Sequence, residues 1–233
     1  MTSIAHKRIA RDVAAVSANE RLLEAQGIYY HYDDADITRG IAMLVGAKGT
    51  PYACGYYFFE IVFPADYPFS PLQVRSLTQD GVTRFNPNMY ICGKVCLSVL
   101  GTWHDGPQWA ATQTLESVLL ALMSAVLNEN PLTNEPAYRN SGNSEEAQIY
   151  RRMITHANAH TAIFAQLCAP PPYAAPFLEK MRTIAAHRSS ELQTILAAAS
   201  EYDGREETLR IFNMRVKYDF AGALRAAAKT DRV

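Results

Sequence analysis

Apolar and polar positions alternate along residues 27–78 of the chain. Residues 55–63, GYYFFEIVF, give the clearest example, because four large apolar side chains occupy every second position: Tyr57, Phe59, Ile61 and Phe63. Side chains two residues apart share one face of a strand, so this pattern predicts a strand with a buried face. Similar patterns predict three further strands, at residues 27–32, 39–47 and 72–78.

The connections between these segments are rich in turn-forming residues: DDAD, AKGTPYACG and PADYPFSP. The last of them has three prolines within eight residues. Proline fixes its own φ angle and cannot donate to a sheet, so we expect a stiff loop outside the sheet. Four strands joined in sequence by turns predict an antiparallel meander.

Helical spacing marks the start and the second half of the chain. Residues 5–25 carry Ile9, Val13 and Val16 at helical intervals, and residues 112–130 form a stronger helix with one apolar stripe. That stripe consists of Leu115, Val118, Leu119, Leu122 and Val126. Leu120 lies off the stripe between Ser117 and Ser124, which predicts an exposed leucine on a face of small polar residues.

Three more helices are predicted in the alanine-rich C-terminal third, at about 144–167, 177–199 and 204–229. The segment APPPYAAP separates the first from the second. Residues 79–111 show no sustained period, but they contain several large apolar side chains, so we expect a packed rather than a disordered loop. The combined pattern predicts an α+β fold.

Composition narrows the class of protein. The chain has 233 residues, of which 48% are hydrophobic and 19% charged, which is typical of a soluble globular protein with a sizeable core. Lys and Arg number 22 against 23 Asp and Glu, so a chain-wide attraction to nucleic acid or acidic lipid is not expected. The N-terminus lacks the apolar region of a secretory signal and no apolar run has membrane-spanning length, so neither a secretory signal nor a membrane span is expected.

Two of the four cysteines, Cys92 and Cys96, lie in the aperiodic loop behind an Asn-Pro-Asn turn. A zinc site there has only His104 as a nearby third ligand, whereas structural zinc takes four. A disulfide between the two thiols would be exposed and labile. A hydrolase with Cys96 activated by His104 is a further alternative, although no nucleophile elbow or protease signature is present. Cys54 and Cys168 are interpreted as packing thiols.

The remaining alternative is acyl transfer through a thioester on Cys96. Such a site needs an accessible thiol on a rigid loop, an amide that stabilises the oxyanion, and an acid that helps the attacking amine. Asn88 lies eight residues before Cys96 and follows Pro87, which stiffens the turn. Glu135 lies in a proline-bracketed loop after the long central helix and is the candidate acid.

The same segments resemble the ubiquitin-conjugating enzyme family over about residues 5–168. KRIARDV resembles the family's first helix, and GTPYACGYYFFEIVFPADYPFSP its hairpin and proline-rich loop. FNPNMY stands where the family has His-Pro-Asn, GKVCLSVL resembles the active-cysteine segment, and TLESVLLALMSAVLNENP resembles the crossover helix with its following loop. The long segment LSVLGTWHDGP, the expanded loop NPLTNEP and the C-terminal extension are similar to the Z-type members and to the conjugating domain of giant inhibitor-of-apoptosis proteins.

The resemblance implies a fold, two regions and three catalytic roles. It implies a ubiquitin-conjugating core over residues 1–168, with a helical extension over 169–233 packed on or beside it. Cys96 would carry ubiquitin, or a ubiquitin-like modifier, as a thioester. Asn88 would stabilise the oxyanion, and Glu135 would gate the site and favour the neutral lysine of the acceptor. The family's motif histidine is Asn86 in this chain.

The resemblance also implies partners, each with its own surface, and no cofactor. Lys7, Arg8 and Arg11 would meet the activating enzyme. Pro68 and Phe69 would bind ubiquitin ligases, and Ser117, Leu120 and Ser124 would hold donor ubiquitin against the thioester. Substrate proteins would supply the lysine. We expect such a protein in the cytoplasm, with the nucleus as a further compartment. The alternative is a catalytically silent module that binds ubiquitin or a ligase.

Overall fold

The fold is organised around a four-stranded antiparallel sheet. The computed structural model describes residues 4–104 and 106–230. Neighbouring strands pair in the order β1-β2-β3-β4, which confirms the predicted meander. The strands are β1 (Ile28–Tyr32), β2 (Arg39–Val45), β3 (Tyr56–Val62) and β4 (Gln73–Ser76), each within a segment predicted from the alternation of apolar residues.

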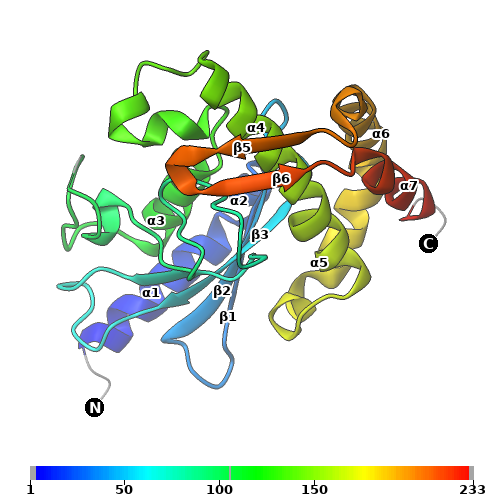
Figure 1. Cartoon of the computed structure of the whole chain (residues 1–233). Coiled ribbons are helices and arrows are strands. Elements are labelled where there is room, and N and C mark those ends of the chain that lie inside the picture. The colour runs from blue at the N-terminus through cyan, green and yellow to red at the C-terminus, as the bar shows by residue number, and fades with distance from the viewer. Residues whose placement is uncertain (1–3, 105, 231–233) are drawn as a thin grey trace.

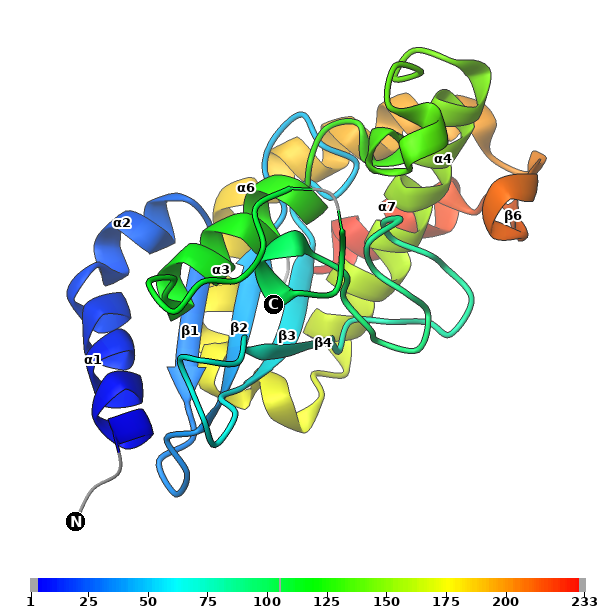
Figure 2. The same ribbon diagram turned by 90° about the vertical axis from the view of Figure 1, so that its left-hand side faces the viewer.

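Helices cover both faces of the sheet (Figure 2). Tyr57, Phe59, Ile61 and Phe63 lie in one buried cluster, as predicted, together with the apolar positions of the N-terminal and crossover helices. The alternate positions pack in a second cluster against the C-terminal part of the chain: Met43, Val45, Tyr56 and Phe58 meet Ala174, Phe177 and Met181. β3 is therefore the buried centre of the molecule.

The N-terminal and crossover helices are shorter than the sequence pattern predicts. The predicted helix over residues 5–25 is divided at Asn19 into α1 (Ile4–Ala18) and α2 (Glu20–Ala25). The crossover helix is α3 (Leu115–Ala121), which continues as the π-helical segment Leu122–Val126. All five residues of its predicted stripe are buried.

The next predicted helix, over about 144–167, is confirmed as α4 (Glu145–Ala157), a π-helical segment (Asn158–Phe164) and α5 (Ala165–Cys168). A 3₁₀ turn over Pro172–Phe177 follows, and α6 (Leu178–Ala199) lies where the sequence predicts a helix. No helix within residues 4–104 and 106–230 has both the length and the apolar character needed to cross a bilayer.

The prediction of a helix over 204–229 is wrong for its first half. Residues Glu206–Leu209 and Met214–Lys217 form β5 and β6, an antiparallel hairpin that lies beside α4 (Figure 1). Helix α7 begins only at Phe220 and ends at Thr230. The segment before Phe220 contains β-branched residues and a turn in which Asn213 adopts a left-handed conformation, with φ of 51°. The alanines that favour a helix are concentrated after Phe220.

Candidate active site

The Asn-Pro-Asn turn is held in place by its first amide. The side chain of Asn86 is buried, and its Oδ1 accepts a hydrogen bond from the backbone nitrogen of Asn88 at 2.8 Å. Its Nδ2 donates to the carbonyl of Val126, at the end of the crossover helix, at 2.8 Å. Asn86 therefore fixes both the shape of the turn and its position against the crossover helix.

Asn88 and Cys96 are joined by two hydrogen bonds. The backbone nitrogen of Cys96 donates to the carbonyl of Asn88 at 2.9 Å, and Asn88 Nδ2 donates to the carbonyl of Cys96 at 2.6 Å. The hydroxyl of Thr102 accepts from the nitrogen of Leu97 at 3.0 Å and lies 3.1 Å from the carbonyl of Val95. The segment that carries Cys96 is consequently held from both sides, as a rigid site requires.

Cys96 differs from the accessible thiol that the sequence predicts. It is a free cysteine, but only 3% of the residue's surface is exposed. Its neighbours Val95 and Leu97 are buried as well, because the loop packs against the core instead of standing away from it. A thiol in this position reaches a bulky substrate only if neighbouring groups move.

Asn134, which the sequence analysis missed, lies close to this site. Its Nδ2 lies 2.9 Å from Oδ1 of Asn88, 3.1 Å from Oδ1 of Asn86 and 2.6 Å from the carbonyl of Ala125. Its Oδ1 accepts from Nδ2 of Asn128 at 2.9 Å. The sequence signal was the density of asparagines in NENPLTNEP. That density does not indicate that Asn134 bonds to the Asn-Pro-Asn turn.

Glu135 is the next residue along the chain and is half-buried. It lies between two 3₁₀ turns, Pro131–Asn134 and Pro136–Tyr138, and its backbone bonds to both. The hydrogen bond from Asn134 to Asn88 therefore brings the backbone of the Glu135 loop next to the Asn-Pro-Asn turn. Cys96, Asn88 and this loop thus lie together, and the catalytic roles of Asn88 and Glu135 stay predictions.

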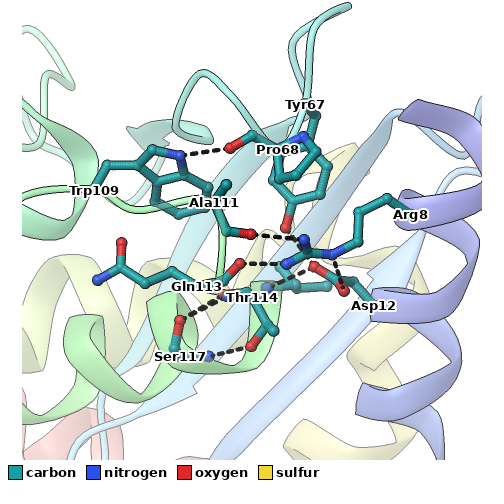
Figure 3. A network of polar contacts seen from close by, with 10 residues as sticks. Arg8, Asp12, Tyr67, Pro68, Trp109, Ala111, Gln113, Thr114 and Ser117 are labelled. Carbon is teal, nitrogen blue, oxygen red and sulfur yellow. Dashed lines mark hydrogen bonds and ion pairs between the residues drawn. The ribbon is translucent and has the colours of Figure 1, made fainter. Parts of the chain in front are cut away.

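The three cations of the first helix do not share one environment. Lys7 and Arg11 are exposed, whereas Arg8 turns toward the body of the domain (Figure 3). Its guanidinium donates to the carbonyls of Ala111 and Gln113, at 2.8 and 2.5 Å. Arg8 thus ties α1 to the segment before α3, a structural role that the sequence pattern did not indicate.

Asp12 completes this network from one turn further along α1. The carboxylate is 2% exposed, accepts from Arg8 Nε at 2.9 Å and is hydrogen-bonded by the hydroxyl of Tyr67. Burial and the adjacent Asp12 carboxylate raise the pKa of Tyr67 well above its usual range, so the phenol stays protonated and acts as the donor. The Asp12 carboxylate is buried, so loss of its partner Arg8 would leave an uncompensated charge in the interior, which is costly.

Tyr67 leads into the loop predicted to bind ligases. Pro68 is buried, and its carbonyl accepts from Trp109 Nε1 at 2.8 Å. Phe69 is 76% exposed, as the prediction of an aromatic anchor requires. The hydroxyl of Tyr67 donates to Asp12, and the carbonyl of Ala111 accepts from Arg8. The Arg8–Asp12 pair therefore holds both the base of the Phe69 loop and the segment that contains Ala111 (Figure 3).

The three residues predicted to face donor ubiquitin are only partly available. Ser117 forms a capping box with Thr114, donating to its carbonyl and accepting from its nitrogen. Leu120 is half-buried against the core, so the prediction of an exposed leucine is met only in part. Ser124 is exposed and bonds to the carbonyl of Leu120.

The other cysteines and His104 do not build a second site. Cys92 is exposed and is not bonded to Cys96, and His104 is exposed and stacks on Trp103. Among residues 4–104 and 106–230 no group of three His, Cys, Asp or Glu is placed to hold a metal ion. Cys54 is buried, and burial raises the pKa of its thiol to about 11. Cys168 is exposed at the end of α5, so its interpretation as a packing thiol is wrong.

Comparison with known proteins gives a consistent result. The sequence profile described as "Ubiquitin-conjugating enzyme" matches residues 8–159, well over half of the chain. Ubiquitin-conjugating enzyme E2 Z of Xenopus tropicalis is 36% identical over 177 residues, which cover 74% of this chain and 55% of that protein. For the human E2 Z the identity is 36% over 157 residues, covering 67% and 43%.

A third relative, probable ubiquitin-conjugating enzyme protein 17 of Caenorhabditis elegans, is 35% identical over 181 residues, or 75% of this chain and 25% of that protein. The chain thus spans between a quarter and about half of the length of these relatives. With the profile match, the meander sheet and the crossover helix, the chain belongs to the ubiquitin-conjugating enzyme family.

Proposed function

We propose that this protein is a ubiquitin-conjugating enzyme that carries ubiquitin, or a ubiquitin-like modifier, on Cys96. The Cys96 thiolate attacks the thioester carbonyl between the modifier's C-terminal glycine and the activating enzyme, and the activating enzyme's thiolate leaves. A substrate lysine or a ligase cysteine then attacks the new thioester. The bond to Cys96 breaks, its thiolate is released, and the modifier passes to the acceptor.

The observation that carries this proposal is the pair of hydrogen bonds between Asn88 and Cys96, in a chain of this family. One N–H of the Asn88 amide donates to the Cys96 carbonyl, and the same NH₂ group has a second N–H that can donate. In this proposal the second donor bonds to the thioester oxygen, on which charge develops during attack by an amine. Asn88 is therefore proposed to stabilise the oxyanion, and Glu135 to orient and desolvate the amine.

Exposed residues supply the proposed contacts with partners. Lys7 and Arg11 offer two cations to an activating enzyme, and Phe69 offers an aromatic anchor to a ligase. Ser124 and the exposed part of Leu120 are proposed to face donor ubiquitin. The cytoplasm, with the nucleus, is the proposed compartment, because free thiols persist under reducing conditions.

A loading reaction tests the proposal. The protein is incubated with ubiquitin, an activating enzyme and ATP, and the adduct is resolved without and with thiol reductant. We expect an adduct that reductant cleaves, a reductant-resistant ester for Cys96→Ser, and none for Cys96→Ala. A Cys92→Ala variant serves as the matched control and loads normally. An adduct that survives in Cys96→Ala would refute the assignment.

Asn88→Ala separates the two steps of the reaction. We expect loading within about twofold of the wild type and discharge to free lysine slower by about 10²-fold, the usual effect of losing one oxyanion donor. Equal losses in both steps would show that Asn88 acts by holding the loop.

The alternative is a silent module that binds ubiquitin or a ligase, and the burial of Cys96 makes the accessibility of its thiol the property to test. The two proposals differ in thiol chemistry. Mass spectrometry after brief alkylation should find Cys92 and Cys168 labelled first, with Cys96 following as its cover opens. A Cys96 that resists alkylation under native conditions, and that does not load, would establish the silent module.

A further inference from the structure

Arg84 connects the Asn-Pro-Asn turn to a distant part of the chain. Its Nη2 donates to the carbonyl of Pro87 at 2.5 Å, and its own carbonyl accepts from the hydroxyl of Tyr150 at 2.6 Å. The guanidinium lies over the ring of Tyr90, with Cζ 3.8 Å from the ring centroid. Arg84 is thus bonded to the middle of the turn that presents Asn88 and stacked on the loop that leads to Cys96.

The second ring under this guanidinium belongs to the C-terminal hairpin. Phe212, in the connection between β5 and β6, lies 5.2 Å from Cζ of Arg84. It also packs against Tyr150 on α4, with ring centroids 5.1 Å apart. The hairpin itself is joined to α4 by the ion pair between Arg152 and Glu207, at 2.6 Å. The end of the hairpin is therefore held where it meets Arg84.

Arg84 Nε is buried without a hydrogen-bond partner among the residues that the structure describes. An unpartnered buried donor is unfavourable, and aromatic faces are the groups that offset it here. Because two rings lie against the same guanidinium, they limit the orientation in which Nη2 reaches the Pro87 carbonyl. A leucine in place of Phe212 would fill similar space but offer no ring face.

We propose that Phe212 and Arg84 are positioning residues for the transfer step, through which the C-terminal hairpin braces the turn that carries Asn88. This inference rests on the proposed function. Loading requires only that Cys96 becomes reachable, whereas discharge also requires the Asn88 amide to be correctly positioned against the reacting carbonyl. Loss of the brace should therefore slow discharge and leave loading nearly unchanged.

The test compares Phe212→Leu, Phe212→Tyr and Val216→Ala in the full chain. Val216 is half-buried on β6 of the same hairpin and serves as the control for general loosening. Pre-loaded enzyme is mixed with free lysine, and the thioester is followed over time. We expect Phe212→Leu to discharge about threefold to tenfold more slowly with loading within twofold. Phe212→Tyr, which keeps the ring, should restore the rate, and Val216→Ala should match the wild type.

Hydrogen–deuterium exchange supplies a readout that does not depend on activity. Phe212→Leu should increase exchange in the peptide covering residues 84–97, whereas Val216→Ala should affect only the hairpin. Unchanged exchange and discharge in Phe212→Leu would overturn the inference, as would equal losses of loading and discharge. If the wild type never loads, the proposed function fails, while the exchange result still decides whether the hairpin braces the turn.

Discussion

At the scale of single residues, the amides around Cys96 are the densest polar feature of the site. Asn86, Asn88, Asn128 and Asn134 form one connected network, and only Asn88 belongs to the proposed chemistry. Asn134 donates to acceptors on two segments that are 46 and 9 residues away in the chain. Buried amides of this kind have to be satisfied together, because each lost donor leaves an acceptor unpaired.

Replacing Asn134 tests this network. Asn134→Ala should lower the free energy of unfolding by about 1–3 kcal/mol, because buried oxygens of Asn86 and Asn88 lose a donor. Asn134→Asp should cost more, since it places a carboxylate against acceptors. Urea unfolding measures both effects, and Ser124→Ala on the exposed face of the crossover helix is the control. A neutral Asn134→Asp would contradict the donor assignment.

His156 on α4 is the titratable residue with the clearest consequence for stability. Its Nε2 accepts from the backbone nitrogen of Asp219 at 3.0 Å, and the ring of His160 lies 4.5 Å away. Burial and the neighbouring His160 lower its pKa from 6.5 to about 4, although Asp219, Asp203 and Asp80 act in the opposite direction. His156 is therefore neutral in the folded protein at physiological pH.

Stability should fall as the pH decreases from about 6.5 to 4, because the unfolded chain binds a proton on His156 that the folded chain resists. The stabilisation is complete above pH 6.5 and is lost toward pH 4. Urea midpoints at pH 7.5 and 5.0 measure the effect. His156→Gln keeps an acceptor for the Asp219 nitrogen and should reduce the difference between the two midpoints; an identical difference in both proteins would exclude His156 as its source.

At the scale of elements, the pair Arg8–Asp12 joins α1 to two loops. Arg8 holds the segment before α3 through carbonyls, and Asp12 holds Tyr67 at the base of the Phe69 loop. Helix α1 also carries the exposed cations Lys7 and Arg11. The Arg8–Asp12 pair therefore fixes this helix relative to the loop that carries the exposed Phe69. The structure assigns different roles to cations that look equivalent in the sequence.

Arg8→Ala should lower the free energy of unfolding by about 3–5 kcal/mol, because Asp12 is left as an unpaired buried charge. The double variant Arg8→Met with Asp12→Asn should recover part of that loss. Lys7→Ala and Arg11→Ala are the matched controls and should remain within about 0.5 kcal/mol of the wild type. Thermal and urea unfolding distinguish these results. Equal, small effects for all three cations would show that the buried pair contributes little.

At the scale of the whole molecule, the C-terminal region covers the second face of the sheet. Phe177 and Met181 pack on Tyr56 and Phe58, while α7 and the hairpin join the larger cluster on the other side of β3. A central strand that is apolar on both faces needs cover on both. Residues 170–230 therefore contribute side chains to the core on both sides of the sheet.

A chain ending at Ala169 should expose the apolar face of Met43, Val45, Tyr56 and Phe58. We expect it to bind a hydrophobic dye and to form oligomers in light scattering, unlike the full chain. Phe177→Ala in the full chain is the milder variant and should lower the free energy of unfolding by about 3–5 kcal/mol. A truncated chain that stays monomeric and unfolds cooperatively would contradict this account.

Local periodicity determined most of the fold. The alternation in residues 55–63 and the stripe of the crossover helix identified the buried faces correctly, because facing depends only on positions two, three or four residues apart. The hairpin of β5 and β6 escaped prediction because its turn depends on one left-handed asparagine and its strands on packing against α4.

For the candidate site, the sequence by itself determined the pair of Cys96 and Asn88 and the turn between Asn86 and Asn88, since these features are close along the chain. Only the tertiary structure decided that Cys96 is covered, that Arg8 faces inward and that Asn134 meets Asn88. Those outcomes depend on partners as far apart along the chain as Arg8 and Gln113, which are separated by 105 positions. Spacing along the chain specifies on which face of a helix or strand a side chain lies. The packing of distant segments specifies which residues that face contacts.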